Sequence, residues 1–328
     1  MTTETTTVPS TLVAEVQVEE VDRLTPAFVR VTFGGPALVD LSTADGFDTR
    51  FKVVFPGATG LLPDHGGVPG RWQEAWLSMA DEERSPMRTY TIREVRAAGD
   101  RVQLVTDFVV HPPAQGRADD LGPACRWALS ARPGDRVHIV GPHRAAPIYG
   151  GTEFDPGELR DLLLIGDETA LPAIARILDD IGPGFTGHVF VEVPSAADIL
   201  DLPHQDLLTV TWLVRGEQQQ GRALVHAVRT HLGLTRTEVD PPLPELSSDL
   251  DVEVWETPRY SSAGEDLSNS SAAAGSTQVP DLADTYAWIA GESWLVKALR
   301  RCLVTELGVE RSRVAFMGYW REGVAMRS

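Results

Sequence analysis

The first part of the chain, from Thr11 to about Val140, consists of short segments in which hydrophobic and polar residues alternate. The segments are rich in Val, Thr, Phe and Tyr, which is typical of antiparallel strands. The glycine-containing segment Arg96–Asp100 should join the last two strands as a hairpin. Several such strands in sequence predict a barrel or a sandwich. The predicted strands are Leu12–Val18, Phe28–Phe33, Phe51–Phe55, Arg88–Val95 and Val102–Val110.

After about Asp155, apolar strands alternate with amphipathic helices, a pattern that indicates a parallel sheet with crossover connections. The sequence therefore predicts an antiparallel β-barrel domain over residues 11–150, followed by a Rossmann-like parallel α/β domain over residues 151–328. The predicted strands of this second domain are Leu162–Ile165, His188–Val193, Leu207–Val214, Tyr286–Ala290 and Val314–Tyr319, and its predicted helices are Ala170–Ile181, Arg222–Leu232 and Ser293–Leu307.

An insertion at about residues 235–280 interrupts the second domain. Between Thr235 and Pro280, Ser, Asp, Glu, Pro, Ala and Gly dominate, and Ser261–Thr277 is nearly pure low complexity. Such a composition offers few apolar side chains to bury, so we expect much of the insertion to be disordered.

Composition narrows the class of protein. The 328 residues are enough for two ordinary domains, and the hydrophobic content of 42% is that of a globular protein. The net charge of −18 argues against binding to nucleic acid or to an anionic membrane surface. No apolar run approaches the roughly 20 residues that span a bilayer, and the first ten residues are polar. We therefore expect a cytoplasmic protein without membrane insertion; its oligomeric state is left open.

The two cysteines, Cys125 and Cys302, lie far apart, and neither has a Cys or His at metal-ligand spacing. Neither a zinc site nor a disulfide framework is indicated. The sequence shows no facial set of His, Asp and Glu either, so we expect no metal site. Any redox chemistry would then require a bound organic cofactor.

The segment Arg88–Arg93 carries the densest chemical signal. On a strand, alternation places Arg88 and Tyr90 on one side and Thr89 and Thr91 on the other. A flavin needs an aromatic face against its ring, a hydrogen-bond donor near its reactive N5 atom and a cation for its phosphates, and these four residues supply all three. An edge strand with one core tyrosine and solvated arginines would look the same, so both interpretations stay open for this segment alone.

Further motifs follow the Arg88 strand in a fixed order. They are DFVVH at Asp107–His111, GPACRWA at Gly122–Ala128, GDETALP at Gly166–Pro172 and GYWR at Gly318–Arg321. Together these motifs resemble the ferredoxin-reductase-like flavoenzymes, and most of all their siderophore-interacting branch. The resemblance covers nearly the whole chain except its first ten residues, the loop after His111 and the insertion.

The resemblance implies an FAD-binding barrel and an NAD(P)H-binding α/β domain. Within the barrel it implies Tyr90 and Thr91 as catalytic residues beside the flavin ring. The FAD-binding residues that it implies are Arg88, Thr89, Tyr90, Thr91, Asp107, Val109, His111, Gly122, Pro123, Ala124, Cys125 and Trp127.

The Gly122–Pro123 pair indicates a helix start whose free N–H groups suit a pyrophosphate, although a purely structural helix cap is the competing hypothesis. Two features depart from the family pattern. The loop after His111 is longer and begins with two prolines, and Cys125 stands where serine is usual. A thiol is a weak donor, which puts that hydrogen bond in doubt. His111 itself is either a flavin neighbour or a satisfied loop histidine.

In the second domain, the turn Gly166–Ala170 follows a buried strand and precedes a helix, where open α/β sheets bind ligands. Acidic residues at a helix start discourage a phosphate, so Asp167, Thr169 and Ala170 are expected to face nicotinamide and flavin. Helix capping by Asp167 or Thr169 is the competing hypothesis, and both can hold together.

The resemblance adds Gly291, Glu292 and Trp320 as residues near the nicotinamide or FAD. Arg215 ends a predicted strand and could meet an adenosine phosphate, but one exposed arginine is a weak indication.

The activity that the resemblance implies is reduction of a ferric siderophore by NADPH or NADH through FAD, with release of Fe(II). An anionic ferric chelate requires a local cationic patch on so acidic a protein, and Lys297 and Arg321 are the candidate substrate residues. Two other functions stay open. One is a flavin-bound siderophore-binding or sensing protein with little turnover, and the other is a reductase that passes electrons to a protein partner.

Overall fold

The computed structural model describes residues 11–42, 46–57, 72–80, 84–111, 121–146, 150–203, 206–234, 255–256 and 282–323. They fall into two compact units. The first unit lies within Met1–Glu153 and includes Ala175–Asp180, and the second lies within Phe154–Ile174 and Ile181–Met326. Among the described residues, no helix is long and apolar enough to cross a membrane.

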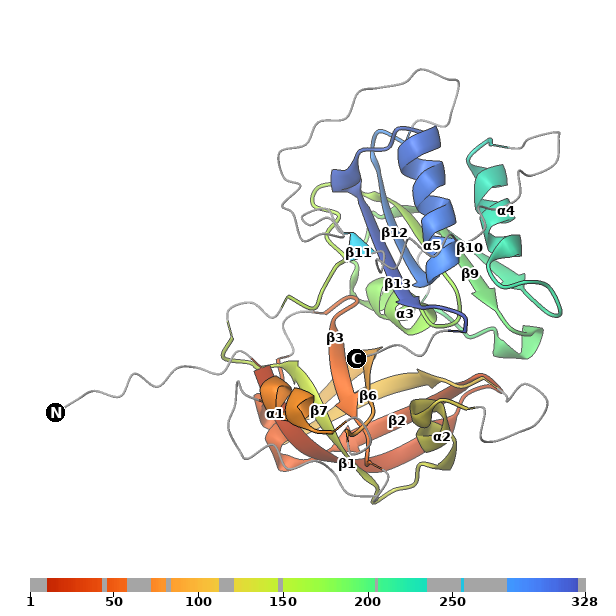
Figure 1. The fold of residues 1–328 in the computed structure, drawn as a ribbon. Helices are drawn as coiled ribbons and strands as arrows, with labels where there is room; N and C mark the ends of the chain where they lie inside the picture. The colour runs from red at the N-terminus through yellow and green to blue at the C-terminus, as the bar shows by residue number, and fades with distance from the viewer. Residues whose placement is uncertain are drawn as a thin grey trace. The chain divides into compact units, whose positions relative to one another are not determined.

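The first unit is built on a seven-stranded antiparallel sheet with the strand order β4-β3-β7-β1-β2-β6-β5 (Figure 1). Its strands are β1 (Thr11–Arg23), β2 (Phe28–Gly34), β3 (Arg50–Val54), β4 (Met87–Thr91), β5 (Glu94–Ala98), β6 (Arg101–Val109) and β7 (Arg136–Pro142), and its helices are a 3₁₀ turn (Pro36–Asp40), α1 (Trp72–Ser78) and α2 (Pro123–Ser130).

The two edge strands of this sheet, β4 and β5, are consecutive in the sequence and are separated by Ile92 and Arg93 alone. The Ile92 N–H donates to the Thr49 carbonyl at 2.9 Å, whereas the Arg93 N–H donates to the Val105 carbonyl at 3.0 Å. The backbone thus leaves the β3 side of the sheet and joins β6 within two residues. Because the two edges are connected so tightly, the sheet must curl on itself, as a barrel requires.

Side chains inside this sheet form the core of the first unit. Alternate residues of β1 (Leu12, Ala14, Val16 and Val18) are all buried in it, as period-2 strand geometry demands. The hairpin of β5 and β6 turns at Gly99, whose φ of 63° lies in the left-handed region that glycine tolerates best. The predicted barrel and hairpin are confirmed, but the run predicted as one strand over Arg88–Val95 is two strands, because each half pairs with a different neighbour.

The second unit contains a six-stranded sheet with the order β10-β9-β8-β12-β13-β11 (Figure 1), parallel except for β11. Helices α4 and α5 pack against one face, where Leu224, Val228, Leu295 and Leu299 meet strand residues such as Ile289. The strands are β8 (Asp161–Gly166), β9 (Thr186–Val193), β10 (Leu208–Val214), β11 (Trp255–Glu256), β12 (Thr285–Glu292) and β13 (Val314–Trp320), and the helices are α4 (Arg222–His231), α5 (Ser293–Arg300) and 3₁₀ turns at Ala196–Asp198 and Arg311–Arg313. Helix α3 (Leu171–Asp180) begins in this unit, and its residues Ala175–Asp180 belong to the first unit.

The predicted α/β pattern is therefore confirmed, with two local differences in the second unit and one unpredicted helix, α1, in the first. The helix predicted over Ser293–Leu307 is α-helical to Arg300 and continues as a π-helical segment over Arg301–Glu306. Within the insertion, Trp255 and Glu256 form the edge strand β11, which pairs with β13. The rest of the insertion, including Ser261–Thr277, and residues 112–120 of the loop after His111 lie outside the described residues.

Candidate functional site

Strand β4 presents Tyr90 to the aromatic part of the barrel core. The Tyr90 ring lies 4.4 Å from the Phe108 ring and 6.5 Å from the Phe55 ring, centroid to centroid. The Tyr90 side chain remains half-buried, so a second ring has access to it. Burial raises the pKa of the Tyr90 phenol, and the hydroxyl therefore stays protonated at neutral pH.

The two threonines of β4 lie on the other side of the strand. Thr89 is exposed and its hydroxyl is 3.5 Å from the Lys52 ammonium nitrogen, while Thr91 is buried opposite Arg50. The predicted alternation is thus what the structure contains. Because Tyr90 and Thr91 lie on opposite sides of the strand, their two side chains cannot both contact a ligand that lies on one side of it.

Helix α2 brings the second predicted motif to the Tyr90 cluster. The Trp127 ring lies 5.2 Å from Phe55, 5.5 Å from Phe108 and 6.1 Å from Phe33. Tyr90 and Trp127 therefore contact the same two phenylalanines. Sequence positions 37 residues apart meet in one aromatic cluster, consisting of Phe33, Phe55, Tyr90, Phe108 and Trp127.

Cys125 lies beside this aromatic cluster. Its thiol is half-buried and donates to the His111 carbonyl oxygen at 3.7 Å, and it is close enough to Tyr90 to contribute to the raised pKa of that phenol. Burial raises the pKa of Cys125 too, so the group is a neutral thiol rather than a thiolate. Its hydrogen bond thus goes to the loop that begins at His111.

The first turn of α2 has the donors that an anion needs. Pro123 occupies the first helical position, the N–H groups of Ala124 and Cys125 have no backbone acceptor among the described residues, and Gly122 offers no side-chain cap. A Cβ added at Gly122 would meet nothing within 4 Å. Arg88 supplies a half-buried guanidinium on the strand that carries Tyr90. A cation, open N–H groups and an aromatic face fit the phosphates and ring of FAD.

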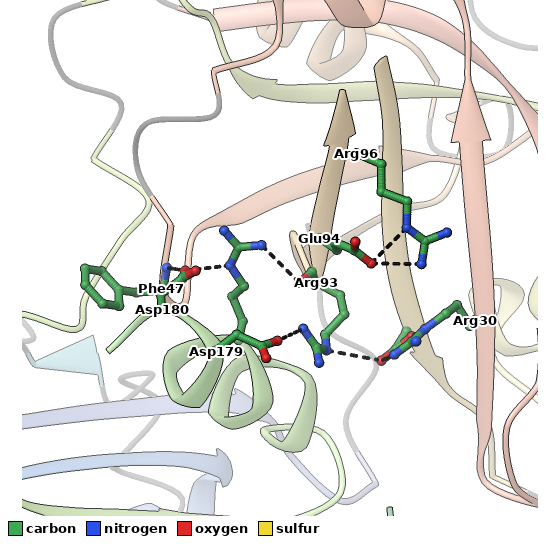
Figure 2. Close-up of polar contacts among 9 residues, drawn as sticks. Arg30, Phe47, Arg93, Glu94, Arg96, Asp179 and Asp180 are labelled. Atoms are coloured by element: carbon green, nitrogen blue, oxygen red, sulfur yellow. Dashed lines mark hydrogen bonds and ion pairs between the residues drawn. The ribbon is translucent and has the colours of Figure 1, made fainter. Parts of the chain in front are cut away.

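Asp107, by contrast, is engaged in pairing the strands of the barrel. Arg30, its cross-strand partner on β2, donates to both carboxylate oxygens, at 2.7 and 2.8 Å. Arg93 approaches the same carboxylate at 3.9 Å and donates to Asp179 at 2.5 Å, within the first unit (Figure 2). With its oxygens held by arginines, Asp107 has a structural role whether or not a ligand is near. Val109 is half-buried at the end of β6.

In the second unit, Asp167 is a fully buried hydrogen-bond centre at the carboxyl edge of the sheet. Its Oδ1 accepts from the Thr169 N–H at 2.9 Å and from the Thr169 hydroxyl at 2.5 Å. Its Oδ2 accepts from Gln220 Nε2 at 3.2 Å, the Glu292 N–H at 2.8 Å and Trp320 Nε1 at 3.1 Å. One carboxylate therefore joins the loops after β8 and β10 to the ends of β12 and β13.

Two glycines permit this close approach. A Cβ at Gly291, where φ is 143°, would lie 2.7 Å from Asp167 Oδ2. A Cβ at Gly166 would lie 2.4 Å from the Cβ of Ala170 and 3.1 Å from the Ala290 carbonyl oxygen. Larger residues at either position would separate the segments that Asp167 holds together.

Glu292 caps helix α5. Its Oε2 accepts from the N–H groups of Trp294 and Leu295, at 2.5 and 3.2 Å, and its Oε1 accepts from the Glu322 N–H at 3.3 Å. Burial raises the pKa of Glu292, and these N–H donors oppose that shift. The Ser293 hydroxyl adds a bond of 2.8 Å to the Trp320 carbonyl, so the start of α5 is tied to the end of β13.

Arg215 lies between two carboxylates that are 0% exposed, Glu168 and Glu192. It donates to both oxygens of Glu168, at 2.9 and 3.0 Å, and to Glu192 Oε1 at 3.2 Å. That oxygen also accepts from the Gly221 N–H at 2.8 Å. The Arg215 side chain is only 12% exposed, so the expectation of an exposed arginine is wrong. Loss of solvation raises the pKa of Glu168 to about 7, and neighbouring Asp167 adds to the shift.

Sequence reasoning placed Glu168 in the Gly166–Ala170 turn without giving it a role of its own, and it missed Glu192 and Gln220 as members of this edge. Glu192 carried a usable signal: a lone acid in the apolar strand of β9 is buried only when it is paired. Gln220 carried none. Among the described residues there is no group of three or more side chains that could hold a metal ion.

Comparison with known proteins places this architecture in a family. Residues 17–146 match the siderophore-interacting FAD-binding domain, and residues 159–323 match the siderophore-interacting protein model. The chain belongs to the siderophore-interacting protein family. The first match contains the aromatic cluster and α2, and the second contains the whole of the Asp167 network, so both sets of predicted motifs lie within the family's matched segments.

Among relatives of the family, the ferric vibriobactin reductase ViuB of Vibrio cholerae is 27% identical over 298 residues, covering 90% of this chain and 84% of the relative. The NADPH-dependent ferric-chelate reductase of Escherichia coli is 31% identical over 211 residues, covering 62% and 72%. A siderophore utilization protein from T. fusca has a similar structure, with a TM-score of 0.64, 26% identity and coverage of 96% and 95%. A ferredoxin reductase of carbazole 1,9a-dioxygenase, 16% identical with a TM-score of 0.52 and coverage of 94% and 70%, shares the fold alone.

Proposed function

We propose that this protein is a ferric-siderophore reductase that binds FAD in its barrel and takes electrons from NADPH or NADH bound to its α/β unit. The observation that carries the proposal is the match over 90% of the chain to a protein named ferric vibriobactin reductase. The E. coli relative, named an NADPH-dependent ferric-chelate reductase, supports the same class of substrate and the nicotinamide donor.

The chain's own residues fit this assignment in the barrel. Arg88 and the open N–H groups at the start of α2 would hold the phosphates of FAD, and the Tyr90 ring would pack on the flavin. When FAD and a nicotinamide are bound, they supply hydride transfer and single electrons for ferric iron, which hard oxygen ligands hold far better than ferrous iron. Thr91, with its side chain turned away from Tyr90, would contribute through its backbone.

The carboxyl edge of the α/β unit is the proposed nicotinamide site, because open parallel sheets bind ligands there. Asp167, Thr169 and Ala170 would shape the site by holding Gly291, Glu292 and Trp320 in place. Asp167 and Glu292 act as positioning residues, since protein N–H groups occupy their oxygens. Arg215 would position Glu168 and Glu192 rather than contact an adenosine phosphate.

Substrate recognition is proposed for Lys297 and Arg321. Lys297 lies on α5 one turn after Ser293, whose hydroxyl is bonded to the Trp320 carbonyl immediately before Arg321. Two cations near one sheet edge would attract an anionic ferric chelate to an otherwise acidic protein. The cytoplasmic location stays a prediction, and the oligomeric state is open.

The test is anaerobic mixing of the purified flavoprotein with NADPH and, separately, with NADH, while the flavin absorbance is followed. A ferric hydroxamate and a ferric catecholate are then added with a ferrous trap. We expect rapid bleaching with at least one nicotinamide and trapped Fe(II) from at least one chelate. Lys297→Ala and Arg321→Ala should slow chelate reduction while flavin reduction is unchanged.

Three outcomes contradict the proposal in different ways. A protein without flavin after purification and reconstitution contradicts the cofactor. Bleaching that takes hours with both nicotinamides favours a binding or sensing protein. Rapid bleaching without trapped iron from either chelate, together with rapid reduction of a ferredoxin, favours a protein acceptor.

A further inference from the structure

The buried hydrogen-bonded network at the carboxyl edge of the α/β unit contains more carboxylates than cations among the described residues. Four carboxylates, from Asp167, Glu168, Glu192 and Glu292, are at most 7% exposed. Among the residues that the structure describes, Arg215 is the cation that contacts two of them, Glu168 and Glu192. Neutral N–H groups and the Thr169 hydroxyl donate to Asp167 and Glu292, and these hydrogen bonds stabilise the two carboxylates without adding a positive charge.

Glu192 shows most directly that the described residues of the network do not balance its negative charge. Its side chain is 0% exposed, and its Oε2 has no hydrogen-bond partner among the described residues. Its other oxygen is shared by Arg215 and the Gly221 N–H. A buried carboxylate oxygen without a donor is costly, and a positive charge nearby would offset that cost.

A nicotinamide supplies such a charge only in one of its two redox states. When the reduced ring gives up hydride, one hydrogen nucleus leaves with two electrons, and the neutral ring becomes a cation while the acceptor gains the hydride. Fixed carboxylates in a buried setting interact with that new charge without reorganising, which is the usual source of electrostatic catalysis.

We propose that the carboxylates of Glu168 and Glu192, with Asp167 and Glu292, favour the cationic oxidised nicotinamide over the neutral reduced ring and so stabilise the positive charge that develops as hydride leaves. This inference rests on the proposed function, because it requires a nicotinamide at this edge. It adds a role for acids that the proposed function uses only to hold the loops in place.

The test compares two ligands that differ only in the nicotinamide ring, which is a cation in one and neutral in the other. NADP⁺ carries the cationic ring, and 1,4,5,6-tetrahydro-NADP carries a neutral ring that cannot donate hydride, so both can be titrated into the oxidised holoprotein by calorimetry. The NAD⁺ pair is titrated in parallel. Phosphate and adenine contributions cancel in the ratio of the two dissociation constants. A change in that ratio between variants therefore reports how the removed carboxylate acts on the charged ring.

The variants are Glu168→Gln and Glu192→Gln, each of which removes one carboxylate with little change in shape. Glu158→Gln is the matched control, because Glu158 is exposed and lies just before the amino end of β8, at the opposite edge of the sheet. At pH 8.5 the wild type should prefer the cationic ring, and each buried variant should reduce that preference by about threefold or more. The control should keep the wild-type ratio.

A second measurement needs no mutation. Among the described residues, the charged groups that act on Glu168 include Asp167 from its own turn and Arg215 from the end of β10, and Arg215 is shared with Glu192 from β9. Because the pKa of Glu168 is raised to about 7, its charge is present at pH 8.5 and is lost as the pH falls through 7. The preference for the cationic ring should therefore decrease between pH 8.5 and pH 6.

The outcomes separate this inference from the proposed function. Equal ratios in the wild type and both buried variants, with no change between pH 8.5 and pH 6, would overturn the electrostatic role while nucleotide binding stands. No binding of any of the four nucleotides to wild-type holoprotein would instead contradict the proposed function. If one variant purifies without flavin or unfolded, the other variant and the pH series still decide.

Discussion

Replacing Asp167 should destabilise the α/β unit more than replacing any exposed acid. Asp167→Ala removes an acceptor that takes five hydrogen bonds and leaves two backbone N–H groups, of Thr169 and Glu292, and the Trp320 indole N–H without it. A buried donor left unsatisfied costs about 1–3 kcal/mol, and the losses are not fully additive. We expect a loss of about 3–5 kcal/mol, a large share of the stability of an ordinary domain.

Asp167→Asn should have a smaller effect for a reason that the geometry defines. The amide has one accepting oxygen, and its NH₂ group must face the donors at one of the two former oxygen positions. The NH₂ group is better accommodated at the Oδ1 position. There the Thr169 N–H is the one donor with a fixed direction, because the Thr169 hydroxyl can rotate away. The retained oxygen can then accept from Gln220, Glu292 and Trp320, so the loss should be about 1–2 kcal/mol.

Urea unfolding followed by circular dichroism measures both losses, with the exposed Asp201→Ala as control, which should stay within about 0.5 kcal/mol of wild type. Flavin absorbance reports on the barrel in the same samples and should be unchanged under native conditions. A loss below about 1 kcal/mol for Asp167→Ala, equal to the loss for the control, would refute the assignment of Asp167 as the centre of this edge.

Three further predictions concern the cofactor, the ion pair and the insertion. Arg88→Ala should purify with little flavin, and Tyr90→Phe should keep flavin that Tyr90→Ala loses, because Phe preserves the ring contact with the core; full occupancy of flavin in Arg88→Ala and Tyr90→Ala contradicts the proposed site. Arg215→Ala should lower stability by about 3–5 kcal/mol, since it leaves two buried carboxylates without their cation; selective loss of NADPH binding at unchanged stability would favour a phosphate contact. Excision of Ser261–Thr277 should leave the rates of flavin and chelate reduction at the wild-type values, and loss of either rate in a folded variant contradicts dispensability.

The elements could be predicted because each depends on local pattern. Period-2 alternation found the barrel strands, and apolar strands alternating with amphipathic helices found the parallel sheet. Which strands pair with one another could not be predicted from local pattern, as the run Arg88–Val95 shows. Its residues are uniformly suited to a strand, but Ile92 and Arg93 bond to opposite edges of the sheet. That division depends on closure of the whole barrel, which no window of sequence contains.

In the candidate site too, the sequence could indicate which residues matter, but it could not indicate which residues they contact. Asp167, Glu292 and Trp320 could be named from motifs, and the structure brings all three together through one carboxylate. Arg215 was recognisable as a cation at the end of a strand. Its partners come from the ends of β8 and β9, so only the parallel sheet, which aligns the carboxyl ends of these strands, brings them into contact.

The insertion shows why composition is a guide to a segment and not to each residue within it. Few apolar residues lie between Thr235 and Pro280, so the average hydrophobicity of the segment is low. Trp255 nevertheless stacks on Tyr319 at 6.0 Å, and Tyr319 in turn meets Trp288 edge-on at 6.5 Å. The pairing of β11 with β13 through Trp255 and Glu256 thus brings an aromatic residue of the insertion against the aromatic residues of the sheet. The part of the insertion that we expect to be dispensable is therefore the low-complexity Ser261–Thr277, and not the segment that carries Trp255.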